Sequence, residues 1–102
     1  MINIIFSEEY KNHDTGNHPE SIKRIEVVNN LLTEEYSKHN LIEPTIAEKQ
    51  IISLVHDVKY VNYIFDSIST SGFTYFDPDT IACPNSLNSY LLAVGGSVDA
   101  VN

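Results

Sequence analysis

The chain has 102 residues, a size that fits one domain or part of one, and its hydrophobic fraction of 42% is typical of a globular protein. Its net charge of −8 argues against binding to nucleic acid or to an anionic membrane, because both require a basic surface. The single cysteine excludes an internal disulfide, and the sequence has neither a signal peptide nor an apolar run of membrane length, so we expect a cytoplasmic protein.

The first third of the chain predicts a strand, a polar loop and a helix. Residues 2–6 form an apolar run rich in β-branched residues, which is typical of a strand buried on both faces of a parallel sheet. Residues 7–17 predict a loop. We expect a helix to begin at Pro19, because the fixed φ of proline suits the first helical position, and to end near residue 40. Its predicted inward face carries Ile22, Ile25, Val28 and Leu32.

The middle of the chain predicts an extended segment and two helices. Residues 41–46 include Pro44 and favour either a short edge strand or an extended link. Residues 47–55 predict a short helix with Ile51, Leu54 and Val55 facing inward. Asp57 is a good N-cap for a second helix, which we expect to run to residue 68.

The last third predicts a strand over residues 73–76, a break at residues 77–80, and a final helix after residues 84–86. Gly95 and Gly96 lie inside this helix, which indicates that another backbone approaches it closely. Strands that alternate with helices predict an α/β fold with a parallel sheet, and two or three strands are too few for a complete one. The final helix has an apolar face made by Leu87, Tyr90, Leu91, Val94, Val98 and Val101.

Candidate functional side chains gather just before the first helix. His13, Asp14, His18 and Glu20 lie within eight residues of one another in the sequence. A functional loop and a simple polar turn before a capped helix both fit this pattern. Metal binding by the two histidines and the aspartate is a further alternative, although their spacing matches no established zinc motif.

Other isolated residues leave similar alternatives. Cys83 fits either a nucleophile that is activated by a nearby histidine or a small buried apolar residue. Asp77 and Asp79 fit a carboxylate pair or a turn. His56 fits a helix junction. The sequence contains no phosphate-binding glycine loop and no Gly-x-Ser-x-Gly motif.

Three segments, in this order, resemble the start of the histone deacetylase and acetylpolyamine amidohydrolase superfamily, nearest its bacterial and class II members. The first is HDTGNHPESIKR over residues 13–24, and the second is LVHDVKYV over residues 54–61. The third is FDPDT over residues 76–80, followed by the helix that carries the glycine pair. Together these segments span nearly the whole chain, and it is their ordered set that makes the resemblance specific.

The resemblance implies an arginase-like three-layer α/β/α domain around a parallel sheet. It also implies hydrolysis of an acetyl amide on a lysine side chain or a polyamine, with one zinc ion as cofactor. Members of the family hold this ion with two aspartates and a histidine, and they move protons with a histidine pair. An acetylated lysine or an acetylated polyamine is therefore the expected substrate of the complete domain.

The sequence also departs from the family pattern. It contains no His-His pair, no Asp-x-His segment and no Gly-Gly-Tyr segment. We therefore expect no catalytic residue and no zinc ligand among residues 1–102. We therefore expect residues 1–102 to be the N-terminal, incomplete part of a single deacetylase domain. We expect this part to be inactive alone, and either to need the remainder of the domain or to associate with itself. The alternative is a non-catalytic remnant or a partner domain of the same fold.

Four positions carry over from the family by resemblance. His18, Pro19 and Glu20 match the loop that borders the substrate tunnel. Arg24 matches the arginine of the inner channel behind the metal, where a guanidinium would guide a carboxylate. The alternative for Arg24 is a structural arginine that binds neighbouring carbonyl groups.

Overall fold

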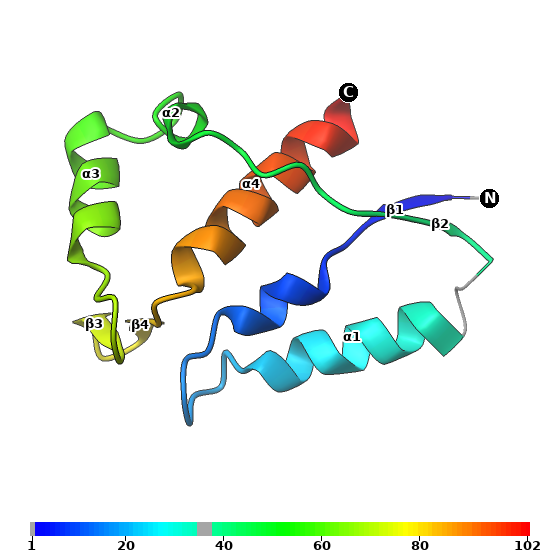
Figure 1. Ribbon diagram of the computed structural model, residues 1–102, viewed down its shortest axis with the longest axis horizontal. Coiled ribbons are helices and arrows are strands. Elements are labelled where there is room, and N and C mark those ends of the chain that lie inside the picture. Colours follow the sequence, from blue (N-terminus) through cyan, green and yellow to red (C-terminus); the bar gives the residue numbers. More distant parts are fainter. Residues whose placement is uncertain (1, 35–37) are drawn as a thin grey trace.

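The computed structural model describes residues 2–34 and 38–102, which form a flat body with extents of 41 × 33 × 19 Å (Figure 1). The long helix α4 crosses the middle of the molecule, with α1 on one side and α3 on the other. The elements in chain order are β1 (Asn3–Ile5), the 3-10 helix η1 (Glu8–Asn12), α1 (Ile22–Glu34), β2 (Asn40–Ile42), α2 (Lys49–Ile52), α3 (Val58–Ser67), β3 (Thr74–Asp77), β4 (Thr80–Ala82) and α4 (Ser86–Val101).

The first strand forms where the sequence predicts it, and it pairs in parallel with β2. The register places Asn3 opposite Asn40 and Ile4 opposite Leu41. This pairing confirms a parallel arrangement and decides that residues 41–46 begin as a strand. The expectation that the first strand is buried on both faces is wrong for this chain: no residue of β1 is fully buried, and Ile2 just before it is 61% exposed. The cause is that β1 has only β2 beside it and contacts α4.

Helix α1 begins at Ile22, three residues later than the sequence predicts. The Ser21 hydroxyl accepts a hydrogen bond from the Lys23 amide at 3.0 Å, so Ser21 caps the helix. The backbone N–H of Glu20 donates instead to the ring of His18 at 3.0 Å. Pro19 and Glu20 therefore belong to the loop and not to the first helical turn. The predicted end near residue 40 is wrong, because Asn40 already belongs to β2; residues 35–37 lie outside the described residues.

The strand predicted over residues 73–76 is present, but it does not join a parallel sheet. Strand β3 pairs antiparallel with β4, which the sequence analysis did not predict. The break at residues 77–80 is the turn of this hairpin. The Asp77 carboxylate accepts hydrogen bonds from the Asp79 amide and the Thr80 hydroxyl at 2.8 and 2.9 Å, which confirms the turn-forming role of Asp77.

The structure agrees with the prediction for α3 but not with the prediction for α2. Asp57 caps α3 as predicted, because its carboxylate accepts a hydrogen bond from the Lys59 amide at 2.8 Å. Helix α2 is shorter than predicted, and its expected inward face is wrong. Ile51 is 39% exposed, and Leu54 and Val55 lie in the following turn with exposed fractions of 79% and 83%.

Helix α4 buries its small residues more completely than its apolar stripe. Its buried residues are Ser86, Ser89, Leu92, Gly95 and Gly96, whereas none of the six residues of the predicted apolar face is fully buried. The glycine prediction is confirmed, because an ideal Cβ at Gly95 would lie only 1.6 Å from the Thr45 carbonyl oxygen. The backbone around Thr45 therefore crosses directly over the middle of α4.

The core of the described residues is small. Its fully buried apolar side chains belong mainly to the hairpin, α3 and α4: Leu32, Val61, Ile68, Ile81, Ala82, Cys83 and Leu92. Many large apolar side chains of the helices stay more than 40% exposed, among them Val27, Val28 and Leu31 of α1. No helix in the described part of the chain combines the length and apolar character needed to cross a membrane.

Candidate functional site: a polar loop fixed to helix α4

The loop over residues 13–20 folds back on itself through its own side chains. The Asp14 carboxylate accepts a hydrogen bond from the Gly16 amide at 2.8 Å, and Gly16 adopts a positive φ of 74° that favours glycine. The buried Thr15 donates its hydroxyl proton to the Glu20 carbonyl oxygen. The two ends of the loop are thereby joined, so the loop has a defined shape before it reaches α1.

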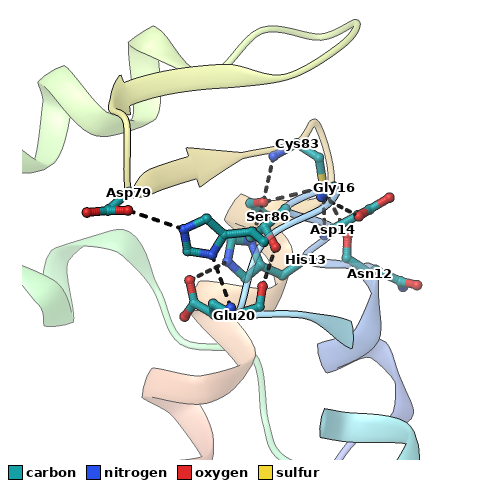
Figure 2. A network of polar contacts seen from close by, with 10 residues as sticks. Asn12, His13, Asp14, Gly16, Glu20, Asp79, Cys83 and Ser86 are labelled. Carbon is teal, nitrogen blue, oxygen red and sulfur yellow. Dashed lines mark hydrogen bonds and ion pairs between the residues drawn. The ribbon is translucent and has the colours of Figure 1, made fainter. Parts of the chain in front are cut away.

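A second set of contacts fixes the start of this loop to the start of α4 (Figure 2). The ring nitrogen Nδ1 of His13 lies 2.6 Å from the Ser86 hydroxyl, which also accepts a hydrogen bond from the Cys83 amide at 2.9 Å. The Cys83 thiol donates to the Asn12 carbonyl oxygen at 3.0 Å and accepts from the Asp14 amide at 3.3 Å. We call these five residues the loop–α4 junction.

Two histidine–carboxylate pairs extend outward from the junction. His13 Nε2 lies 3.9 Å from Glu20 Oε2. His18 Nε2 lies 3.6 Å from Asp79 Oδ1 at the tip of the β3–β4 hairpin. The Asp79 side chain is 95% exposed, so its pairing with His18 is weak and screened by solvent. The structure thus brings His18 close to the hairpin and Glu20 close to His13, while Pro19 between them is exposed.

The junction resembles a nucleophile–base–acid series in its order of groups, but its burial excludes that chemistry. Ser86 is 0% exposed, so no substrate can reach its hydroxyl. Cys83 is 7% exposed, and its sulfur is already hydrogen-bonded to two groups of the loop. The structure therefore supports the buried, structural interpretation of Cys83, and the junction holds the loop in place.

A cleft of about 270 Å³ opens between the loop, α1 and α4. Arg24 lies on its α1 side, and Tyr90 and Ser89 lie on its α4 side. Burial raises the pKa of Tyr90, with a smaller contribution from the Glu20 charge, while a hydrogen bond with Ser86 acts in the opposite direction. Burial likewise raises the pKa of Tyr10, also at this cleft. Both phenols are therefore neutral near pH 7 and offer hydrogen-bonding groups.

The histidines and carboxylates of the loop do not converge in a group of three. A zinc site needs three or four nitrogen, sulfur or oxygen donors around one point, and no group of three histidine, cysteine, aspartate or glutamate residues is so placed within residues 2–34 and 38–102. His13 Nδ1 and His18 Nδ1 are each used in a hydrogen bond. The alternative in which His13, Asp14 and His18 together bind a metal is not supported.

The sequence analysis missed the partners that α4 supplies to this site. Ser86, Ser89 and Tyr90 lie about 70 residues beyond the loop, and no local pattern links them to it. The sequence places Ser86 in the lead into the final helix and Tyr90 on the apolar face of that helix, and neither position indicates a contact with the loop. The burial of two serines on one face of the helix, three residues apart, is a signal that they accept or donate specific hydrogen bonds.

Comparisons with known proteins give a consistent result. The family model for the histone deacetylase domain matches residues 18–102. The crystal structure of the HDA15 HD domain superimposes with a TM-score of 0.82 at 24% sequence identity, over 95% of this chain and 30% of that chain. Comparison with curated protein sequences finds no match. The chain therefore belongs to the histone deacetylase family and spans about 30% of the length of that solved structure.

Proposed function

We propose that residues 1–102 form the N-terminal segment of a zinc-dependent deacetylase domain with an arginase-like, three-layer α/β/α architecture. The reaction of the complete domain would be hydrolysis of the acetyl amide of an acetylated lysine or polyamine. Support comes from the family match over residues 18–102 and from the parallel pairing of β1 with β2. The negative charge of the chain suits a substrate that is cationic beyond its acetyl group.

The observation that carries the proposal is the way the polar loop is built. A loop that served only to connect η1 with α1 would not need its start fixed to α4 by the buried His13–Ser86 contact. Such fixed loops on a rigid scaffold are where binding residues commonly lie. We therefore assign His18, Pro19 and Glu20 to the border of the substrate tunnel.

For Arg24, which is an exposed residue of α1, the proposed role is that of the inner-channel arginine. It lines the cleft of about 270 Å³ behind the loop, together with the hydrogen-bonding side chains of Tyr90 and Ser89. A guanidinium at this cleft would guide a small carboxylate such as the acetate product. The proposed role of these residues is to bind and orient the substrate and the product. Bound zinc would supply the polarised carbonyl and the activated water of the reaction.

The second candidate function is a non-catalytic remnant or partner domain of deacetylase fold. In that case the loop and cleft would be inherited features of the fold that no longer serve a reaction.

The two candidates are separated by analysis of the natural gene product. We expect its mass to exceed that of the 11.5 kDa chain, and we expect it to contain zinc and to deacetylate an acetyl-lysine peptide or an acetylpolyamine. The activity should be lost with a chelator and restored by zinc. We expect the 102-residue chain alone to show neither stoichiometric zinc nor turnover. A natural product of 102 residues without zinc would support the non-catalytic candidate, and a zinc-loaded, active 102-residue chain would contradict our assignment of roles.

A further inference from the structure

Glu20 is the residue on which the contacts of the polar loop converge. Its backbone N–H donates to His18 Nδ1 at 3.0 Å, and its backbone carbonyl oxygen accepts from the Thr15 hydroxyl. Its carboxylate oxygen Oε2 lies 3.9 Å from His13 Nε2. The backbone of Glu20 is therefore fixed within the loop, and the direction of its side chain depends on how the His13 ring is held.

The His13 ring is held from its opposite side by helix α4. Its Nδ1 lies 2.6 Å from the Ser86 hydroxyl, and its edge packs against the Tyr90 ring with the ring centroids 5.2 Å apart. Tyr90, which also hydrogen-bonds with Ser86, is neutral near pH 7 and has a proton of its own to donate. In Figure 2, His13 lies between Ser86 and Glu20. These contacts turn Nε2 of His13 toward Glu20.

The hydrogen bonds of Ser86 decide which nitrogen of His13 carries the proton. The hydroxyl accepts from the Cys83 amide at 2.9 Å and has one proton to donate. His13 Nδ1 at 2.6 Å is a closer and stronger acceptor than the Cys83 sulfur at 3.4 Å, which also accepts from the Asp14 amide. A neutral imidazole that accepts at Nδ1 carries its proton on Nε2. His13 therefore presents an N–H to the Glu20 carboxylate.

We infer that Ser86 is a positioning residue of the proposed deacetylase. Its buried hydroxyl holds His13 with the proton on Nε2, and His13 in turn orients the Glu20 carboxylate. The inference rests on the proposed function, which places Glu20 at the border of the substrate tunnel. The Glu20 side chain is 56% exposed and forms no ion pair with a lysine or arginine of the described residues, so it is open to a cationic group of the substrate. A carboxylate that is oriented in advance loses less freedom on binding.

The second histidine of the loop is an internal reference. His18 Nδ1 accepts from the backbone amide of Glu20, which can only donate, so the neutral His18 ring also carries its proton on Nε2. Ser86 has no part in this contact. Removal of the Ser86 hydroxyl should therefore release the tautomer of His13 and leave that of His18 unchanged.

Nitrogen NMR of the 102-residue chain tests the first step, because the signals of the ring nitrogens show which of them carries the proton. At about pH 8, where an ordinary imidazole is neutral, we expect Nε2–H for both histidines. In Ser86→Ala, His13 should become a mixture of the two tautomers. Ser89→Ala is the matched control, because Ser89 is also buried on α4 but donates to the Glu9 carbonyl oxygen. Both rings should keep their proton on Nε2 in this control.

The variant Glu20→Gln tests the second step, since it keeps the shape of the side chain and removes its charge. In the 102-residue chain, the Nε2 signal of His13 should move while the tautomer stays. In the natural gene product, Ser86→Ala and Glu20→Gln should each raise KM about two- to fivefold for an acetyl-lysine peptide with flanking lysines. The double variant should be no worse than Glu20→Gln alone, because both changes remove the same contact. A peptide with flanking glutamines should show no such rise.

Several outcomes would overturn the inference. They are a His13 ring that carries its proton on Nδ1 in the original chain, an unchanged His13 tautomer in Ser86→Ala, additive KM effects in the double variant, and an equal rise of KM with the glutamine peptide. If Ser86→Ala does not fold, the tautomer of the original chain and the response of His13 to Glu20→Gln decide the question. A natural gene product without deacetylase activity would contradict the proposed function, whereas the NMR results would still decide whether Ser86 acts on Glu20 through His13. The two failures are therefore distinguishable.

Discussion

The two ends of helix α4 differ in burial and in the contacts that other parts of the chain make with them. At the N-terminal end, Ser86 is fully buried and hydrogen-bonded to His13 and Cys83, which lie on other segments. At the C-terminal end, Val98 and Val101 are 42% and 87% exposed, and they lie at an apolar pocket of about 500 Å³ that α2 and the turn after it also line. One helix thus has a completed polar contact surface and an incomplete apolar one.

This difference between the two ends is a difference between polar and apolar groups. No buried side-chain nitrogen or oxygen in the described residues lacks a hydrogen-bond partner, so the polar interior is complete within the chain. Apolar side chains, in contrast, stabilise the fold only when they leave water, and Val98 and Val101 have not done so. The polar loop is held in shape by contacts within the chain, whereas the last turn of α4 keeps apolar side chains in water.

The largest effect on stability is expected at Gly95, where the backbone of Thr45 lies against α4. Gly95→Ala should destabilise the chain by about 3 kcal/mol, because the new methyl group would collide with the Thr45 carbonyl oxygen and force the backbone to move. The change is measured by urea unfolding. Gly96→Ala is the control, since its nearest neighbours are side chains at 3.2 Å, which can shift. Equal losses in both variants would contradict the close approach at Thr45.

Removal of the junction hydroxyl should have the next largest effect. Ser86→Ala should lower the free energy of unfolding by about 1–3 kcal/mol, because it leaves the buried Cys83 amide and His13 Nδ1 without a partner. Ser97→Ala is the matched control on the same helix, where the hydroxyl is exposed and bonds only to the Ala93 carbonyl oxygen. If both variants unfold at the same urea concentration, the polar end of α4 is not the anchored one.

The cleft beside the junction should make the chain sensitive to alkali. Burial raises the folded-state pKa of Tyr90 above its usual value of about 10, so the stabilisation is fully present below pH 10. It is lost as the pH rises through the higher folded-state pKa, because the unfolded chain ionises more readily. Tyr90→Phe should therefore show a shallower loss of stability between pH 10 and the pH of unfolding, with Tyr10 causing the remaining slope. Stability that rises with pH in this range would contradict the buried position of Tyr90.

The smallest effect is expected at the open end of α4. Val101→Ser should change the free energy of unfolding of the isolated chain by less than about 0.5 kcal/mol, because the side chain is already 87% exposed. The same urea measurement applies. A decrease of about 1 kcal/mol or more in the free energy of unfolding would mean that the Val101 side chain packs against the chain itself, and it would contradict the exposed position.

The sequence predicted the existence of most elements and the position of the polar loop. Periodicity and capping rules identified α3 from Asp57, because a cap acts within one turn of its helix. The same local rules placed the start of α1 at Pro19, since they could not show that the His18 ring would take the Glu20 amide. They also missed β4, whose three residues follow too closely on β3 to form a separate pattern.

Burial was less predictable than element type. Apolar periodicity assigns an inward face on the assumption that the chain contains its own core, and this assumption fails for Leu54, Val55 and Val101. Contacts between distant segments, such as that of Cys83 with residues 12 and 14, also leave no local signal. Local clustering marks His18 and Glu20 as candidates but fits a plain turn as well, and a tunnel-border role for them comes only from the resemblance to a family.

Amide hydrogen exchange along α4 tests the contrast between its two ends most directly. In the isolated chain, we expect slow exchange for the amides of the buried residues Ser89 and Leu92, and fast exchange for those of Val98 to Val101. Uniform protection along the whole helix of the isolated chain would contradict the account.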